Sequence, residues 1–301
     1  MRLYQINKDK LINIKEESFK LERNMQKLIE ENLETLMGLK VVKSEFSIKD
    51  RRFDTLAYDS EEKSFVIIEY KRDRNSGVVD QGIAYLHLLI NNKAEAILEA
   101  NERLGLQLKK SEINWEAMKV IFVASSFTDN QIESADDKGL PIELWEVKKY
   151  GQNCLAVNVI KKSGSNESIN LLAQKSKVFK DVAKEVKVYT EQDHLNRVPE
   201  DIRELYNQFK EAILNLDSQI EVQAKKPYIA FKKDSSNVCD IEVWQKCLKI
   251  YANAKWGELD DSKKLFENVS KKGHWGNGNY RVVVSDSKNL EYIMSVLKQL
   301  L

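Results

Sequence analysis

The sequence has few cysteines and no long apolar run, and each shortage excludes a class of protein. Only Cys154, Cys239 and Cys247 occur in 301 residues, an odd and sparse set that argues against a disulfide framework and favours a reducing compartment. No C-x-x-C pair suggests zinc binding. No stretch approaches the ~20 apolar residues of a membrane-spanning helix, and MRLYQINKDK lacks the apolar core of a signal peptide. We therefore expect a cytoplasmic protein, of a bacterium or an archaeon, without a membrane segment.

The chain also lacks the strong positive charge that is typical of proteins coating nucleic acid. It has 48 Lys and Arg against 47 Asp and Glu, a formal net charge of +1. Any nucleic-acid binding must therefore come from a local patch. With 42% hydrophobic residues the chain can bury a core, and its 301 residues suffice for one large domain or two ordinary ones.

Hydrophobic periodicity predicts a mixed α/β domain over 1–160, a polar linker over 161–187 that contains one helix, and a small α+β domain over 188–301. The first domain is expected to open with a hairpin around NKDK, then a helix that Ser18 can cap and Gly38 can end. Its remaining elements are three strands (VVKSEFSI, RFDTLAYD, SFVIIEYK), a helix over about 77–100, a buried strand (KVIFVASS), a short helix and two more strands.

The second domain shows a different alternation of elements. Its predicted helices are PEDIRELYNQFKEAILNL, DDSKKLFENVSK and SKNLEYIMSVLKQLL. Its strand-like segments are KPYIAFKK, CDIEVWQKCLKIYAN and NYRVVVSD.

The strand SFVIIEYK ends in charged side chains, which is unexpected because its apolar run FVII is typical of a buried strand. Residues two apart in a strand share a face, so Glu69 and Lys71 point the same way. Asp54 lies in the preceding strand, across the predicted turn SEEK, and two carboxylates and an ammonium then meet at one sheet edge. Two close carboxylates repel unless a cation lies between them, and a hard cation such as Mg²⁺ takes oxygen ligands. The group therefore predicts a metal site equipped to hydrolyse a phosphodiester.

The E-x-K pattern alone is weak evidence, since it occurs four times in this highly charged chain. Only the copies at 69–71 and 146–148 end predicted strands, and only the first follows a paired strand that carries an acid. Gln81 and Tyr85 then lie four apart, on one face of the next helix. A structural ion pair at a sheet edge is the alternative interpretation of this cluster.

The ordered set of motifs resembles the PD-(D/E)xK nuclease superfamily, and more closely its NucS-type branch, whose first helix begins E-x-D-L. The likeness covers about residues 18–160. Two positions depart from it: Asn24 stands where the branch has Asp, and Phe53 stands where the superfamily has a nominal proline. The positions that match the site motifs are Glu22, Asp54, Glu69, Lys71, Gln81 and Tyr85.

The resemblance implies a restriction-endonuclease-like fold, with a mixed central sheet flanked by helices, and a metal-dependent endonuclease acting on DNA in repair or defence. It implies that Asp54, Glu69 and the main-chain carbonyl of Tyr70 bind Mg²⁺ or Mn²⁺. Glu22 would act on a second metal or through water, and the Q-x-x-x-Y pair would support the site and touch the nucleic-acid backbone. NucS-like proteins tend to dimerise, so the resemblance also implies a homodimer.

Two basic runs, KDRR and KRDR, bracket the site. Charge runs are usually just solvated, but beside a phosphodiester site they can hold backbone phosphates. The DNA-binding candidates in these runs are Arg51, Arg52, Arg72 and Arg74.

The stretch WGELDDSKKLFENVSKKGHWGNGNY resembles a C-terminal domain of the DUF5655 type, which often follows such nuclease-like domains. Two interpretations from other classes stay open. One is a non-cleaving module that binds nucleic acid or protein on a nuclease fold, for which the near-zero net charge and Asn24 leave room. The other is an interaction protein that acts mainly through its C-terminal domain.

Overall fold

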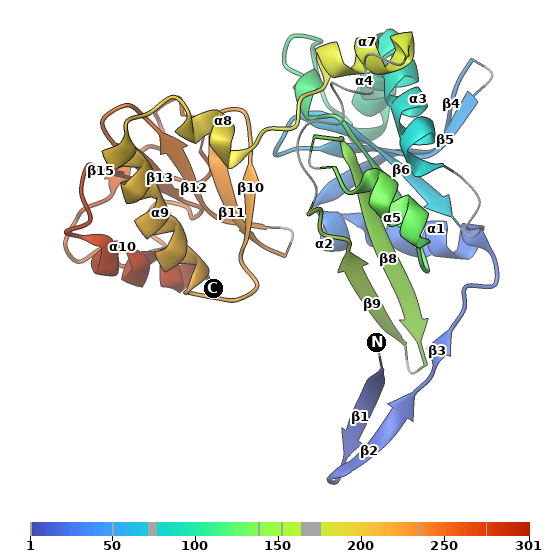
Figure 1. Ribbon diagram of the computed structural model, residues 1–301, viewed down its shortest axis with the longest axis horizontal. Coiled ribbons are helices and arrows are strands. Elements are labelled where there is room, and N and C mark those ends of the chain that lie inside the picture. The colour runs from blue at the N-terminus through green and yellow to red at the C-terminus, as the bar shows by residue number, and fades with distance from the viewer. Residues whose placement is uncertain are drawn as a thin grey trace. The chain divides into compact units, whose positions relative to one another are not determined.

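The computed structural model describes residues 2–49, 51–71, 77–137, 139–151, 153–163, 176–234, 236–274 and 276–301. The chain divides into two compact units, Met1–Val188 and Tyr189–Leu301 (Figure 1). The described residues form two buried apolar clusters in the first unit and one in the second. None of the described helices combines the length and the apolar composition that crossing a bilayer requires.

The first unit is built on a seven-stranded sheet with the order β3–β8–β7–β6–β5–β4, and β9 pairs with β8. β6 runs parallel to β7 and β7 parallel to β8, whereas the other neighbours are antiparallel. The predicted mixed sheet is therefore confirmed. Its strands are β3 (Glu16–Glu17), β4 (Leu39–Ile48), β5 (Arg51–Asp59), β6 (Ser64–Lys71), β7 (Lys119–Ala124), β8 (Ile142–Tyr150) and β9 (Cys154–Val159).

Helices cover both faces of this sheet, which explains why β6 reads as an almost continuous apolar run. One face packs against α3 (Val78–Asn91), α4 (Lys93–Leu104), α5 (Asp129–Ala135) and α7 (Lys177–Glu185). The other face packs against α1 (Glu22–Glu31) and α2 (Leu33–Met37). The predicted order of helix, three strands, helix and strand is observed, and it brings the ends of β5 and β6 between α1 and α3.

Two predicted helices are each divided in the structure, and an asparagine stands at both breaks. Asn32 separates α1 from α2, and its side-chain amide donates to the carbonyl of Leu28 over 2.8 Å. Asn92 separates α3 from α4 and donates to the carbonyl of Leu88 over 2.7 Å. An asparagine side chain that bonds the backbone one turn earlier competes with helix continuation. Gly38 ends α2 at a φ of 68°, as the sequence predicts.

The predicted hairpin at the N-terminus forms between β1 (Leu3–Asn7) and β2 (Lys10–Ile14). The C-terminal part of the predicted linker, in contrast, is not a connection. Helix α7 places Phe179 and Val182 in the core beside α3, and the chain up to Val188 belongs to the first unit. Residues 164–175 of that predicted linker lie outside the described part of the chain.

The second unit is a smaller α+β domain, as predicted, with a six-stranded antiparallel sheet of order β10–β11–β12–β13–β15–β14. Helices α9 (Glu200–Leu214) and α10 (Leu290–Leu297) contribute to its apolar core, and α8 (Glu191–Leu195) precedes them. The strands are β10 (Glu221–Ala224), β11 (Ile229–Lys233), β12 (Ser236–Val243), β13 (Leu248–Ala252), β14 (Glu267–Asn268) and β15 (Tyr280–Val284).

The helix predicted for DDSKKLFENVSK is wrong, because turns and the short strand β14 occupy this stretch. The carboxylate of Asp261 accepts hydrogen bonds from the main-chain N–H groups of Leu265 and Phe266, over 3.1 and 2.8 Å. Lys264 has a φ of 53°, outside the helical region. An aspartate that satisfies nearby backbone donors offers the chain an alternative to the helix.

Candidate active site

The end of β6 carries the polar residues that the sequence singles out. Glu69 lies on the face of β6 that α3 covers, two residues after Ile67 of the same buried cluster. The β5–β6 register ends with Thr55 opposite Ile68, one residue before Asp54 and Glu69. The charge of Glu69 acts on the Asp54 carboxyl, so the two carboxylates lie near each other at the end of β6.

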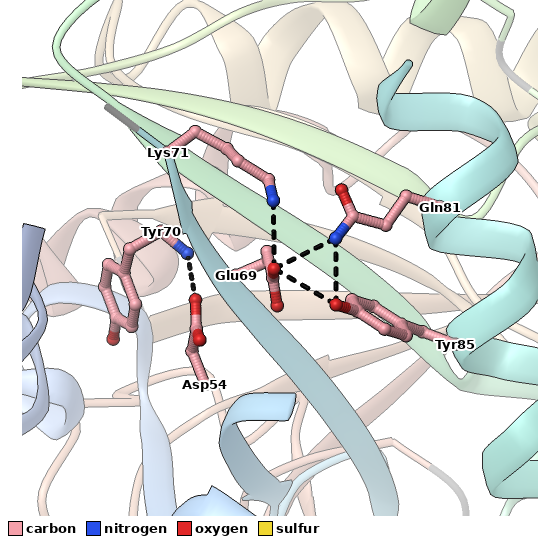
Figure 2. A network of polar contacts seen from close by, with 6 residues as sticks. All are labelled: Asp54, Glu69, Tyr70, Lys71, Gln81 and Tyr85. Carbon is pink, nitrogen blue, oxygen red and sulfur yellow. Dashed lines mark hydrogen bonds and ion pairs between the residues drawn. The ribbon is translucent and has the colours of Figure 1, made fainter. Parts of the chain in front are cut away.

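Three donors converge on a single oxygen of the Glu69 carboxylate (Figure 2). Its Oε1 accepts from Lys71 Nζ over 2.9 Å, from Gln81 Nε2 over 3.0 Å and from Tyr85 Oη over 3.1 Å. Gln81 also donates to Tyr85 Oη over 2.8 Å, which leaves the tyrosine proton for Glu69. Gln81 and Tyr85 come from successive turns of α3, and the edge of the Phe53 ring packs on Tyr85 with centroids 5.1 Å apart.

The second oxygen of the Glu69 carboxylate, Oε2, accepts none of these hydrogen bonds. Glu69 Oε2 is buried and has no hydrogen-bond partner among the described residues, and the same holds for Gln81 Oε1. A buried carboxylate oxygen without a partner is costly, because it has lost its water without a replacement. The site therefore fixes one oxygen of Glu69 and leaves the other available to a ligand.

The side chain of Asp54, on β5, is held by the main chain of β6. Its Oδ2 accepts a hydrogen bond from the main-chain N–H of Tyr70 over 2.9 Å (Figure 2). Burial raises the pKa of the Asp54 carboxyl from 3.8 to about 7, and the negative charge of Glu69 adds to the rise. The charge of Glu22 also raises the pKa of Asp54, whereas the hydrogen bond from the Tyr70 N–H and the charge of Lys71 lower it. The charge of Glu69 is thus close enough to disfavour ionisation of Asp54, a situation that a bound cation relieves.

The carboxylate oxygens at the site are ligands that suit a hard divalent cation, but they are few. The unpartnered Glu69 Oε2 and the crowded Asp54 carboxylate are anionic oxygen ligands of the kind that Mg²⁺ prefers. Across the described ranges, no three His, Cys, Asp or Glu side chains gather into a metal-binding group. A cation here would therefore rely on two carboxylates, the Tyr70 carbonyl and water, which is compatible with magnesium because it usually keeps several waters.

The other sequence candidates lie at the periphery or beyond the described chain. Glu22 is exposed on the first turn of α1 and affects the site through its charge on Asp54. Arg51 and Arg52 are both exposed, and Arg52 forms an ion pair with Glu45 over 2.7 Å. Arg72 and Arg74 lie outside the described residues.

Sequence reasoning missed Gln26, which is buried on α1 and donates to the main-chain carbonyl of Asp54 over 3.0 Å. The available signal was its spacing, since Gln26 lies four residues after Glu22 and so on the same face of α1.

The first unit is thus a mixed α/β domain in which the buried carboxylate of Glu69 and the half-buried carboxylate of Asp54 lie at the ends of two central strands. A protein of Haemophilus influenzae, described only as uncharacterized, is 48% identical over 299 residues, covering 99% of each chain. The chain belongs to the family of that protein. Residues 191–299 match DUF5655, a domain of unknown function, so the predicted resemblance of the C-terminal region to this domain type is confirmed.

Solved structures resemble parts of the chain. A structure of an EndoMS–dsDNA complex is 25% identical, with a TM-score of 0.25, and the match covers 43% of this chain and 47% of that one. A repair endonuclease from Pyrococcus abyssi is 22% identical, with a TM-score of 0.25 and coverages of 44% and 50%. The chain thus spans about half the length of these proteins.

Proposed function

We propose that the first unit is a metal-dependent endonuclease that hydrolyses phosphodiester bonds in DNA, with Mg²⁺ or Mn²⁺ bound by Asp54, Glu69 and the carbonyl of Tyr70. The observation that carries the proposal is the asymmetry of the Glu69 carboxylate. One oxygen is fixed by three donors, while the other is buried, without a described partner, beside a second carboxylate. Fixing one oxygen orients the other, as outer hydrogen bonds do for metal ligands.

Each neighbouring side chain has a distinct task in this proposal. Gln81 and Tyr85 orient Glu69 from α3, and the N–H of Tyr70 orients Asp54. Lys71, whose side chain is only 16% exposed, neutralises charge that develops on the phosphate. A bound magnesium or manganese supplies Lewis acidity toward a phosphoryl oxygen and a water of lowered pKa.

DNA is the proposed substrate because the resemblance to the NucS-type branch points to it and exposed arginines lie near the site. Arg51 and Arg52 begin the strand that carries Asp54, where they can contact backbone phosphates. Arg52 must first exchange its ion pair with Glu45 for a phosphate. The predicted homodimer stays a prediction, and light scattering at micromolar concentration tests it.

The test of the proposed function combines metal binding with cleavage. Calorimetry with Mn²⁺ should detect one or more sites, and duplex, branched or single-stranded DNA should be cut when Mg²⁺ or Mn²⁺ is present. Glu69→Gln should lose both properties. Equal cleavage by the wild type and Glu69→Gln would reveal a contaminating nuclease, and the absence of both metal binding and cleavage would overturn the proposal.

The second candidate function is a non-cleaving module that binds nucleic acid or protein on the same fold. It is favoured by the absence, within the described ranges, of a group of three side-chain ligands and by the net charge of +1. Binding of DNA without metal binding or cleavage would select this function.

A further inference from the structure

The buried amide of Gln26 lies at the junction of α1, β4 and β5. Gln26 is only 8% exposed, and three of the four polar atoms that its Nε2 contacts are carbonyl or carboxylate oxygens, which can only accept, whereas the fourth is a hydroxyl. This surrounding identifies the atom as the nitrogen of the amide, since its oxygen would be repelled there. The four acceptors are Asp54 O at 3.0 Å, Ser44 Oγ at 3.1 Å, Glu30 Oε1 at 3.2 Å and Glu45 Oε1 at 3.3 Å.

Strand pairing is interrupted, without a change of register, where this contact occurs. The register of β4 and β5 pairs Ser44 with Thr55 and Phe46 with Phe53, but it passes over Glu45 and Asp54. Glu45 has a φ of 54°, a left-handed conformation that interrupts a strand. On the other side, the last pair of the β5–β6 register is Thr55 with Ile68. Asp54 is therefore not a paired residue in either register: it lies between two pairs of the β4–β5 register and just past the last pair of the β5–β6 register.

Two hydrogen bonds that involve a side chain hold Asp54 in place. Its carboxylate is held by the N–H of Tyr70, and its main-chain carbonyl is held by Gln26. Glu30, which shares the Gln26 amide, also accepts a short hydrogen bond from Thr55 Oγ1. The residue following Asp54, Thr55, is thereby bound to the next turn of α1.

We infer that Gln26 is a positioning residue for Asp54: its amide anchors the main chain of Asp54 to α1 and so sets where the Asp54 carboxylate lies relative to Glu69. The consequence for metal binding rests on the proposed function, in which Asp54 is a ligand. The anchoring itself does not, because it concerns only the placement of the end of β5.

The obvious alternative is that Gln26 merely satisfies buried acceptors and contributes to stability like any other buried amide. A matched control separates the two roles. Gln131 is also nearly buried, at 6% exposure, and lies on a helix of the same unit, where it forms a capping box with Thr128 of α5. Gln131→Leu should therefore destabilise the unit without disturbing Asp54.

The first experiment needs neither metal nor substrate. Hydrogen exchange is measured on the full chain at the amide of Tyr70, which bonds Asp54, and at that of Ile121 in neighbouring β7. Gln26→Leu should lower protection at Tyr70 at least about tenfold more than at Ile121, because local opening adds to any global loss. Gln131→Leu should lower both equally. An equal loss at both amides in Gln26→Leu would overturn the inference.

The second experiment measures Mn²⁺ affinity by calorimetry. Loss of a residue that orients a metal ligand lowers affinity by about 10–100-fold, which is the change expected for Gln26→Leu, whereas Gln131→Leu should stay close to the wild type. Gln26→Asn, which keeps an amide but is shorter, should show smaller changes in both experiments and serves if the leucine variant does not fold. A wild type that binds no Mn²⁺ would overturn the proposed metal site, and the exchange data alone would then decide whether Gln26 positions Asp54.

Discussion

The hydroxyl of Tyr85 donates a hydrogen bond to Oε1 of Glu69 over 3.1 Å. Burial raises the pKa of Tyr85 to about 12, and the charge of Glu69 adds to the rise. The hydroxyl therefore keeps its proton throughout the neutral range and remains a donor. This bond therefore helps to fix the direction in which the unpartnered Oε2 of Glu69 points.

Replacing Tyr85 with phenylalanine should weaken metal binding without damaging the fold. The ring would keep its edge contact with Phe53, but Glu69 Oε1 would lose one of its three donors. We expect Mn²⁺ affinity to fall about tenfold, measured by calorimetry. Tyr58→Phe, at a buried tyrosine farther along β5, is the control and should bind Mn²⁺ like the wild type. Unchanged affinity in Tyr85→Phe would contradict the orienting role.

Glu69→Gln should abolish Mn²⁺ binding and DNA cleavage, because it removes the anionic oxygen that has no described partner. The amide is isosteric, so the thermal unfolding temperature should change little. Glu143→Gln is a suitable control, since Glu143 lies on β8 and is ion-paired with Lys119 over 2.8 Å. That variant should retain cleavage even if it loses stability. Mn²⁺ binding that survives in Glu69→Gln would place the cation elsewhere.

The raised pKa of Asp54, about 7 instead of 3.8, predicts the pH dependence of the metal-free protein. Between these values the folded state holds a proton that the unfolded state has released, so this group makes stability fall as pH rises through the window. The loss is a few kcal/mol at most, since one pKa unit corresponds to about 1.4 kcal/mol. Urea unfolding from pH 4 to 8 measures it, and Asp54→Asn should flatten the curve. A cation competes with the same proton, so Mn²⁺ affinity should increase up to about pH 7.

If Asp54→Asn leaves the pH dependence of unfolding as it is in the wild type, Asp54 is not the group that titrates. The carboxylates would then be farther apart, or better hydrated, than a shared cation site requires.

Lys71→Met should separate catalysis from binding. Lys71 lies at the end of β6 and contacts Glu69 over 2.9 Å, so its loss removes a positive charge where charge develops on the phosphate. The cleavage rate should fall about 10²–10³-fold. DNA affinity should change only a few-fold, because phosphate contacts are spread over several basic residues. Lys43→Met, which breaks an ion pair with Glu99 in the same unit, should cleave normally. A Lys71→Met variant as fast as the wild type would assign Lys71 a structural role.

Local patterns were sufficient to predict much of the site. Strand parity places Glu69 and Lys71 on one face, and the four-residue spacing of Gln81 and Tyr85 places both on one face of α3. The structure brings these four side chains into contact. Their assignment as catalytic residues stays a prediction until the variants are measured.

What could not be predicted depends on contacts between segments distant in sequence. Gln26 reaches Ser44 and Asp54 only because α1 packs across β4 and β5. Its spacing places it on the same face of α1 as Glu22, but does not report which strands that face packs against. The wrong helix over DDSKKLFENVSK has a similar cause. Its apolar spacing favours a helix, but the bonds that Asp261 makes to the backbone and to the Tyr292 hydroxyl fix another path.

The second unit offers a stability test that is independent of the proposed function, at Gly278 in the loop before β15. Gly278 has a φ of 82°, and a Cβ there would lie 2.0 Å from the carbonyl oxygen of Ala252 on β13. Gly278→Ala should therefore destabilise this unit by about 3 kcal/mol or more, since backbone atoms must move in addition to the left-handed strain. Gly257→Ala is the matched control, because its φ is 99° but nothing lies within 4 Å of the added Cβ. It should cost only about 1–2 kcal/mol. Thermal unfolding of the three proteins measures both, and equal losses in the two variants would mean that the loop can move away from β13.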